Sequence, residues 1–364
     1  MLGDFCTLYN AALESRISAW RANISLGYAA QAITLKECRD VYPDLSRWSF
    51  TALQQVLRRL DKSYRAFFRR VKAGEKPGFP RYRSRSRYNS ADFRVGDGLR
   101  IDKDSRLRFV GVKNSIRVKW HRYLPNAPNS AILVNRAGKW FVVFHVEVTA
   151  QEPVQCRPNV VGIDVGLTSL VALSNGETVK TPQCYRDSQP KRKRLQRAVA
   201  RKRKGSHSRR KAIRDLARHS QHVACQRKDF AHKLSRQLVT RFTHIAIEDL
   251  NIKGLAGGML AKSVHNAAWG QLIAFTRYKA ESAGVEVEAV NPRGTSQTCI
   301  CGASTPKTLR DREHVCETCG LVEDRDVISA QVILQRSSFG AGAALGAQSK
   351  DIGPRLAPEA VCFS

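Results

Sequence analysis

The sequence has no run of about twenty apolar residues and no basic N-terminal segment followed by a hydrophobic core. A membrane-spanning helix and a secretion signal need those features, so we expect neither and infer a soluble, cytoplasmic protein. Cysteine also lacks the pattern of a disulfide framework, because six of the ten cysteines are isolated in the chain. A length of 364 residues leaves room for two or three domains.

Acidic residues are scarce. The chain has 31 Asp and Glu against 62 Lys and Arg, which gives a formal net charge of +31. Solubility needs far less charge than this, so a polyanion is the expected partner, and nucleic acid fits best.

Three of the few acidic residues, Asp164, Glu248 and Asp326, lie where strands end or a helix begins. Residues 160–164 and 243–248 are short apolar runs, which predict strands buried on both faces of an α/β sheet. Open α/β sheets place their sites at the carboxyl edge, where Asp164 and Glu248 would lie. Asp326 comes just before a helical apolar pattern. A ribonuclease H-like sheet would gather the three carboxylates at one point.

Carboxylate oxygens suit Mg²⁺, and a pair of such ions stabilises the attacking and leaving oxygens in phosphodiester hydrolysis. We therefore predict Asp164, Glu248 and Asp326 as metal ligands and catalytic residues. Each acid alone could instead end a strand or cap a helix. Asp324 competes with Asp326 for the third position, and Asp249 competes with Glu248.

The remaining four cysteines, Cys299, Cys301, Cys316 and Cys319, form two close pairs. Paired thiolates on two facing turns predict a closed, structural Zn²⁺ site rather than a catalytic one. The second pair has the usual CxxC spacing, whereas the first is CxC. His314 or a water could replace one thiolate there.

Near the N-terminus, apolar residues recur at spacings of three and four between positions 53 and 71, which predicts a helix with a packing face. Arginines lie on its opposite face, and an extended basic segment with interleaved aromatic residues follows at positions 81–88. Charge and stacking groups together suit a nucleic-acid groove. The candidates for contact are Arg58, Arg59, Arg81, Arg83 and Arg85.

From position 91 to about 150 the apolar period changes to two, which predicts a small β-barrel with a hairpin turn at residues 135–139. Residues 186–218 then carry fifteen Lys and Arg against two Asp. We interpret this stretch as two helices hinged near residues 205–208, before another helix at residues 230–242, and as a nucleic-acid-binding insertion rather than a solvated face. The candidates are Lys191, Arg192, Lys193, Arg194, Arg201, Lys202, Arg203, Lys204, Arg209 and Arg210.

The motifs together resemble the TnpB family, which small bacterial and archaeal transposons encode and which is related to the type V CRISPR effectors. The most specific are VGIDVGL at residues 161–167, IEDLNIKG at 247–254 and TSQTC at 295–299, which leads through the cysteines to DRD at 324–326. The resemblance covers nearly the whole chain.

The resemblance implies an RNA-guided DNA endonuclease, whose guide RNA comes from the transposon end and pairs with one strand of double-stranded target DNA. It implies Mg²⁺-dependent catalysis by Asp164, Glu248 and Asp326, with one site cutting both strands in succession. Recognition of a short motif beside the target would fall to Tyr9, Asn10, Gln54 and Gln55, although each could instead serve helix packing. A monomeric ribonucleoprotein is expected.

The expected domains follow from the same resemblance. They are a helical recognition lobe at residues 1–90, a wedge-like β-barrel at 91–157, a RuvC-like domain at 158–294 with a basic helical insertion at 186–242, a zinc ribbon at 295–322, a last RuvC-like segment at 323–336 and a disordered tail at 337–364.

Three departures from the family pattern bear on activity. The first helix starts almost at once, so a short strand of the barrel is expected to be missing. The first cysteine pair is CxC, and Ile328 stands where an asparagine is usual. The shortened start and Ile328 keep a second function open, a guided DNA-binding protein or repressor without cleavage. A third interpretation is a guide-independent, resolvase-like nuclease.

Overall fold

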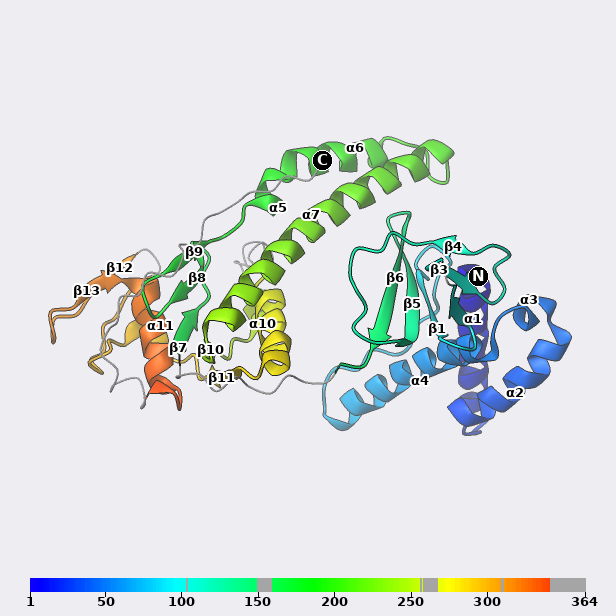
Figure 1. Ribbon diagram of the computed structural model, residues 1–364, viewed down its shortest axis with the longest axis horizontal. Helices are drawn as coiled ribbons and strands as arrows, with labels where there is room; N and C mark the ends of the chain where they lie inside the picture. The colour runs from blue at the N-terminus through cyan, green and yellow to red at the C-terminus, as the bar shows by residue number, and fades with distance from the viewer. Residues whose placement is uncertain (103, 149–158, 256, 258–267, 309–310, 341–364) are drawn as a thin grey trace. The chain divides into compact units, whose positions relative to one another are not determined.

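The computed structural model describes the chain except for residues 103, 149–158, 256, 258–267, 309–310 and 341–364. It divides into two compact units, Met1–Thr149 and Ala150–Ser364 (Figure 1). Among the described helices, none combines the length and the apolar character that crossing a membrane requires. The predicted disordered tail lies outside the described residues from position 341 onward.

The first unit begins with helices and continues with strands. Its helices are α1 (Leu2–Arg21), α2 (Tyr28–Val41), α3 (Pro43–Ser46) and α4 (Phe50–Lys72). Its strands are β1 (Ser90–Arg94), β2 (Leu99–Ile101), β3 (Arg106–Phe109), β4 (Ile116–Arg117), β5 (Pro128–Arg136) and β6 (Lys139–Val146).

Helix α4 shows why these residues form a core. The Ser49 hydroxyl caps the helix by accepting the Ala52 N–H at 3.2 Å. The apolar stripe from Leu53 to Leu60 is then buried in a cluster that also includes residues of α1 and β1. The predicted packing face is confirmed for this half of the helix. It is wrong for Phe68 and Val71, which are 59% and 50% exposed.

The strands of the first unit form two antiparallel sheets, β1-β5-β6 and β2-β3-β4. The predicted hairpin turn joins β5 to β6, and Ala137 and Gly138 adopt φ values of 50° and 84° there. Phe5 of α1 packs against Phe93 of β1, so helices and strands share one core. The division into a recognition lobe and a wedge-like barrel stays a prediction.

The second unit is an α/β structure. Its strands are β7 (Val160–Asp164), β8 (Ser169–Leu173), β9 (Thr178–Lys180), β10 (His244–Glu248), β11 (Glu286–Val290), β12 (Glu313–Val315) and β13 (Val322–Asp324). Its helices are α5 (Cys184–Asp187), α6 (Gln189–Ala200), α7 (His207–Arg241), α8 (Ile252–Leu255), α10 (Trp269–Ala283), the 3-10 turn η1 (Thr295–Gln297) and α11 (Arg325–Arg336).

The central sheet has the order β11-β10-β7-β8-β9. Strands β7, β10 and β11 are parallel, while β8 and β9 continue from β7 as antiparallel neighbours. Side chains alternate across the sheet: Ile245 and Ile247 join the core under α7 and α10, whereas Ala246 packs with Ile333 of α11. Helices therefore cover both faces, as the apolar strands predicted (Figure 1).

The basic insertion folds as a helical hairpin of α6 and α7, with a turn at residues 201–206 that overlaps the predicted hinge at residues 205 and 206. The separate helix expected at residues 230–242 is instead the second half of α7, which is continuous over 35 residues. No glycine or proline interrupts it, so nothing in the backbone ends the helix early. Its C-terminal half supplies Leu234, Leu238 and Val239 to the core, while its N-terminal half pairs with α6.

Candidate active site, metal centre and nucleic-acid interface

Asp164 and Glu248 end two neighbouring parallel strands. In the pairing of β7 with β10, Ile163 lies opposite Ile247. The next residue on each strand is the acid, so the two carboxylates leave the same edge of the sheet, where strands are about 4.8 Å apart. The sequence prediction that these two acids share the carboxyl edge agrees with this register.

Asp326 reaches that edge because α11 packs very closely on β7. A Cβ on Gly162 would lie 2.0 Å from the Ala330 carbonyl oxygen, so only glycine permits this approach. The first turn of α11 then faces the loop after β7, where a Cβ on Gly166 would lie 3.5 Å from Asp326 Oδ2. Asp324, the competing acid, caps the helix by accepting the N–H groups of Asp326 and Val327 at 2.8 and 3.2 Å.

All three carboxyl groups lie where ionisation is disfavoured, chiefly because they are partly buried. Burial, followed by the charges of Glu248 and Asp326, raises the pKa of Asp164 to about 8. Burial also raises the pKa of Glu248, against the opposing hydrogen bond from Thr295 and the charge of Arg336. Burial and the neighbouring Asp324 raise the pKa of Asp326. Such a group of acids gains stability from a bound cation.

The acidic edge is open rather than closed around a single ion. Among the described His, Cys, Asp and Glu side chains, the four cysteines form the one group of three or more whose ligand atoms lie close enough to share an ion, all within 4.8 Å of one another. The carboxylates are hard oxygen donors and half-buried, which fits Mg²⁺ ions that keep waters and substrate oxygens in their coordination shells. Asp249, the competitor of Glu248, is exposed.

Two residues that the sequence did not single out position this edge. The Thr295 hydroxyl is hydrogen-bonded to Glu248 Oε1. The Trp269 indole N–H donates to the Gly166 carbonyl at 3.0 Å and ties down the loop after Asp164. Thr295 belongs to the TSQTC motif, so a signal existed for it, whereas nothing local marks Trp269.

Ile328 is 1% exposed within the core of this unit. Its side chain has no polar atom, so it donates no hydrogen bond to a carboxylate or to a metal-bound water. The departure noted in the sequence is therefore a packed residue rather than an unfilled position.

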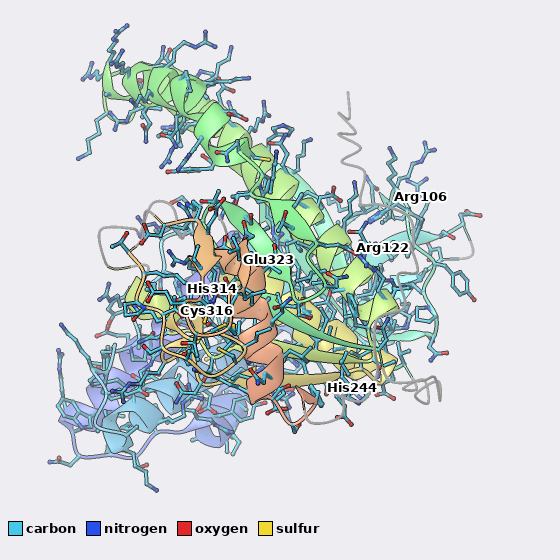
Figure 2. All side chains as sticks on the ribbon, turned by 90° about the vertical axis from the view of Figure 1, so that its left-hand side faces the viewer. Arg106, Arg122, His244, His314, Cys316 and Glu323 are labelled. Carbon is cyan, nitrogen blue, oxygen red and sulfur yellow. The ribbon has the colours of Figure 1, made fainter. Side chains whose placement is uncertain are left out.

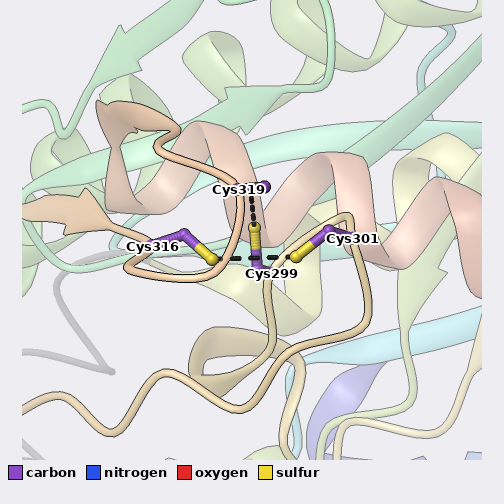
Figure 3. A group of neighbouring side chains, drawn as sticks. All are labelled: Cys299, Cys301, Cys316 and Cys319. Carbon is purple, nitrogen blue, oxygen red and sulfur yellow. Dashed lines mark hydrogen bonds between the residues drawn. The ribbon is translucent and has the colours of Figure 1, made fainter.

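The four cysteines converge as predicted (Figure 3). Cys299 Sγ lies 3.7 Å from Cys319 Sγ, and Cys301 Sγ lies 3.7 Å from Cys316 Sγ. Four sulfurs at about 2.3 Å from a tetrahedral Zn²⁺ would be about 3.8 Å apart, so the cluster has the dimensions of a structural zinc site. The CxC spacing closes because Gly302 adopts a φ of 88° in the first turn.

The cysteine turns affect the individual thiols differently. The backbone N–H of Cys319 is the largest influence on Cys316 and lowers the pKa of its thiol to about 6. Burial raises the pKa of Cys299 to about 12, which a bound cation would reverse. His314 is fully buried close to Cys316 (Figure 2), and its Nδ1 contacts the Lys307 ammonium. The alternative that it replaces a thiolate is not needed, since four sulfurs already converge.

The predicted nucleic-acid contacts of the second unit lie on the α6–α7 hairpin, whose side chains with nitrogen tips point to all sides (Figure 2). None of the residues of α6 is buried. One face of this helix lines a groove that includes Lys193, Arg194 and Arg201, together with Arg197, which the sequence analysis did not select. The remaining predicted cations, Lys191, Arg192, Lys202, Arg203, Lys204, Arg209 and Arg210, are exposed or half-exposed.

Three of those cations also have structural partners. Arg192 donates to the Tyr185 hydroxyl at 2.6 Å. Arg209 and Arg210 donate to the carbonyls of Lys202 and Gly205 at 3.1 and 3.2 Å, which holds the turn between the helices.

In the first unit, Arg81, Arg83 and Arg85 are exposed. Arg58 and Arg59 line a groove on α4 with Gln55, but Arg59 is also paired with Asp92 at 3.2 Å.

The proposed flanking-motif residues differ in access. Tyr9 is 1% exposed in the core, which favours the packing alternative for it. The Asn10 amide bonds the backbone of Arg83 in both directions, at 2.8 Å each. Gln54 and Gln55 are half-buried, and Gln55 faces the α4 groove. These four assignments stay predictions.

Comparison with known proteins places this arrangement in a family. A family model described as "Probable transposase" matches residues 143–258, and one described as a Cas12f1-like TNB domain matches residues 269–333. A protein of Streptomyces pristinaespiralis, provisionally named an RNA-guided DNA endonuclease, is 34% identical over 337 residues, covering 90% of this chain and 82% of that protein. The chain belongs to the TnpB family.

Further TnpB-family similarity comes from InsQ of Escherichia coli K12, which has the same provisional name. It is 28% identical over 300 residues, which are 78% of this chain and 73% of InsQ. The structure also matches the protein chain of a solved Cas12f1-sgRNA-target DNA complex. The match covers 91% of this chain and 92% of the Cas12f1 chain, with 14% identity and a TM-score of 0.37. That structural likeness is too distant to support an assignment.

Proposed function

We propose that this TnpB-family protein is an RNA-guided, Mg²⁺-dependent DNA endonuclease that cuts double-stranded DNA beside a short flanking motif. The observation that carries the proposal is the meeting of Asp164, Glu248 and Asp326 at one sheet edge, where burial raises the pKa of each carboxyl and the charges of Glu248 and Asp326 raise that of Asp164 further. The provisional names of the relatives support the same activity.

The second unit would be a RuvC-like nuclease domain. Its support is the sheet order, in which β7, β8 and β9 are antiparallel and the parallel strands β10 and β11 follow on the other side of β7. This order supports the ribonuclease H-like sheet that the positions of the acids predict. Helix α11 completes the site from the face opposite to α7 and α10.

In this proposal Asp164, Glu248 and Asp326 hold the metal. Bound Mg²⁺ would supply charge stabilisation for the attacking and leaving oxygens of the phosphodiester. Thr295 fixes one oxygen of Glu248 by its hydroxyl, so that the other oxygen stays available as a ligand. Trp269 holds the loop beside Asp164 by its bond to Gly166.

The partners would be a guide RNA from the transposon end and the target DNA, in a monomeric ribonucleoprotein. The support is the exposed cations of the α6–α7 hairpin and of residues 81–85. The cysteine cluster would hold structural Zn²⁺ and fix the chain between η1 and α11.

A second candidate, a guided DNA-binding protein without cleavage, rests on Ile328, whose buried apolar side chain cannot support a metal-bound water. A guide-independent resolvase has no use for the basic hairpin.

The test is cleavage of a plasmid library with randomised bases beside one target, by protein co-expressed with the RNA encoded downstream of its gene. Mg²⁺-dependent products that share a short flanking motif are expected. Guide-dependent binding without products would favour the second candidate, and cutting without RNA would favour the third.

A further inference from the structure

The apolar stripe of α4 continues beyond the core into a cluster of aromatic rings that solvent reaches. We call Tyr64, Phe67, Phe68 and Phe79 the α4 aromatic cluster. Neighbouring ring centroids lie 5.2 Å apart for Phe67 and Phe68, and 5.4 Å apart for Phe67 and Phe79. Phe68 is 59% exposed and Phe79 is 48% exposed, so about half of each ring is bare.

Contacts with neighbouring side chains hold the rings of the cluster in place. Phe79 stands nearly perpendicular to Tyr64 and Phe67, at 85° and 82°, which is the edge-to-face arrangement that aromatic pairs prefer. The Arg16 guanidinium lies 5.1 Å from the centre of the Tyr64 ring. Tyr64 and Phe67 therefore support the cluster, while Phe68 and Phe79 present it to solvent.

The charged side chains around the cluster are mainly basic. Residues 61–83 carry eight Lys and Arg and two acids. One of those acids, Asp61, is already paired with Arg16 at 3.2 Å and Arg65 at 2.7 Å. In the described part of the chain, no ion pair involves Arg69, Arg70 or Arg81. A polyanion with flat apolar faces matches this surface, and an apolar protein segment does not.

We propose that Phe68 and Phe79 form a stacking platform for unpaired bases of a bound strand, with Arg69, Arg70 and Arg81 contacting its phosphates. Aromatic side chains beside a cationic track bind single strands in this way without sequence preference. The proposal rests on the proposed function for its choice of nucleic acid as the partner. The proposal gives a role to exposed rings, because packing of the apolar stripe of α4 against the core does not account for them.

The test uses full-length protein free of nucleic acid and a 12-nucleotide single strand carrying 2-aminopurine, whose fluorescence is quenched when it stacks. Binding should quench the probe. Phe68→Leu and Phe79→Leu keep an apolar side chain but remove the ring, so each should restore fluorescence and raise the Kd about tenfold. Val71→Ala is the matched control, because Val71 is 50% exposed in the same patch without a ring, and its Kd should stay unchanged.

Salt dependence separates stacking from charge. The slope of log Kd against log salt should be the same in both leucine variants and the wild type. It should fall by about 0.7 in Arg69→Gln, which removes a single-strand phosphate contact but leaves the quenching in place. DNA, RNA and duplex versions of the probe identify the preferred strand; equal quenching of the duplex would contradict a site for unpaired bases.

Wild-type Kd and quenching in both leucine variants would overturn the proposal. If those variants also lowered the Tm of the free protein by roughly 5 °C or more, the rings would instead be covered by other parts of the chain. No step of this assay involves cleavage. A protein that quenches the probe but never cuts DNA would contradict the nuclease proposal and leave the stacking platform standing.

Discussion

Helix α11 contacts two clusters of potential metal ligands, one of which is open to solvent and the other closed. At its N-terminus, Asp326 joins carboxylates from β7 and β10 at an open, half-buried edge. Near its C-terminus, Gln335 donates to the Ile300 carbonyl at 3.1 Å, within the turn that carries Cys299 and Cys301. There the four sulfurs close on one another, whereas the carboxylates do not.

The difference explains why we propose the acidic edge, and not the cysteine cluster, as the site of chemistry. A closed tetrahedral set leaves no position for substrate, so a metal held there would only stabilise the fold. An open set of hard donors leaves coordination positions for water and phosphate. Burial and the two neighbouring acids also raise the pKa of Asp164 to about 8, and a strongly shifted pKa of this kind is typical of functional sites.

The strongest test of the closed site is Cys316→Ser, which removes one buried sulfur of the cluster. We expect zinc content to fall from about one ion per chain to near zero, and the unit to lose several kcal/mol of stability, because structural zinc contributes directly to folding. Metal analysis and thermal unfolding measure both. Cys225→Ser, an exposed isolated cysteine, is the control and should change neither. An unchanged zinc content in Cys316→Ser would contradict zinc binding by the four cysteines.

Cleavage at the open site should depend on the orientation of the Glu248 carboxylate as well as on the presence of the three acids. Thr295→Val deletes the hydroxyl that holds Glu248 and should lower the cleavage rate about 10- to 100-fold, with the affinity for target unchanged. Thr295→Ser keeps the hydroxyl and should retain most activity. Equal losses in the two variants would mean that Thr295 acts through packing.

Asp164→Asn should stabilise the protein in the absence of Mg²⁺. The folded state holds a proton on Asp164 up to a pKa of about 8, while the unfolded state releases it near pH 4. Stability is therefore lost as pH rises from about 4 through 8, and the neutral amide avoids that loss. We expect a gain on the order of 1–3 kcal/mol at pH 8 and less at pH 5. Thermal melts of both proteins at the two pH values measure it, and a gain independent of pH would contradict this origin.

The smallest effect is expected for single substitutions on the basic hairpin, because many exposed cations would contribute to RNA binding there. Arg197→Gln should weaken RNA binding only a few-fold and reduce the slope of log Kd against log salt by about 0.7 to 0.9. Arg209→Gln is a useful comparison, because Arg209 also holds the turn through the Lys202 carbonyl. Unchanged slopes in both variants would place the RNA elsewhere.

The sequence predicted the elements whose signals are local. Short apolar runs marked β7 and β10, and the carboxylates at their ends follow from parallel pairing. Paired cysteines predicted their own cluster, because thiolate spacing is itself a geometric constraint. The helical hairpin could be predicted from its charge and from the hinge at Gly205, although the continuity of α7 was missed where two apolar stripes were treated as separate helices.

What could not be predicted depends on contacts between distant segments. The bond from Trp269 to Gly166 spans 103 residues. The close approach of α11 depends on the missing side chain of Gly162 at one point of the sheet. Periodicity assigns an apolar stripe to a face of α4 but cannot tell where the covering core ends, so the exposure of Phe68 emerged only from the structure.

The most direct measurement of the central claim compares wild-type and Asp164→Ala ribonucleoproteins on one target plasmid, with cleavage and target binding followed side by side in Mg²⁺. The account predicts that wild type cuts, that the variant loses at least about a thousandfold in cleavage rate, and that the Kd for target is the same in both. A variant that still cuts, or one that loses target binding together with cleavage, would contradict the assignment of Asp164 to a catalytic metal site.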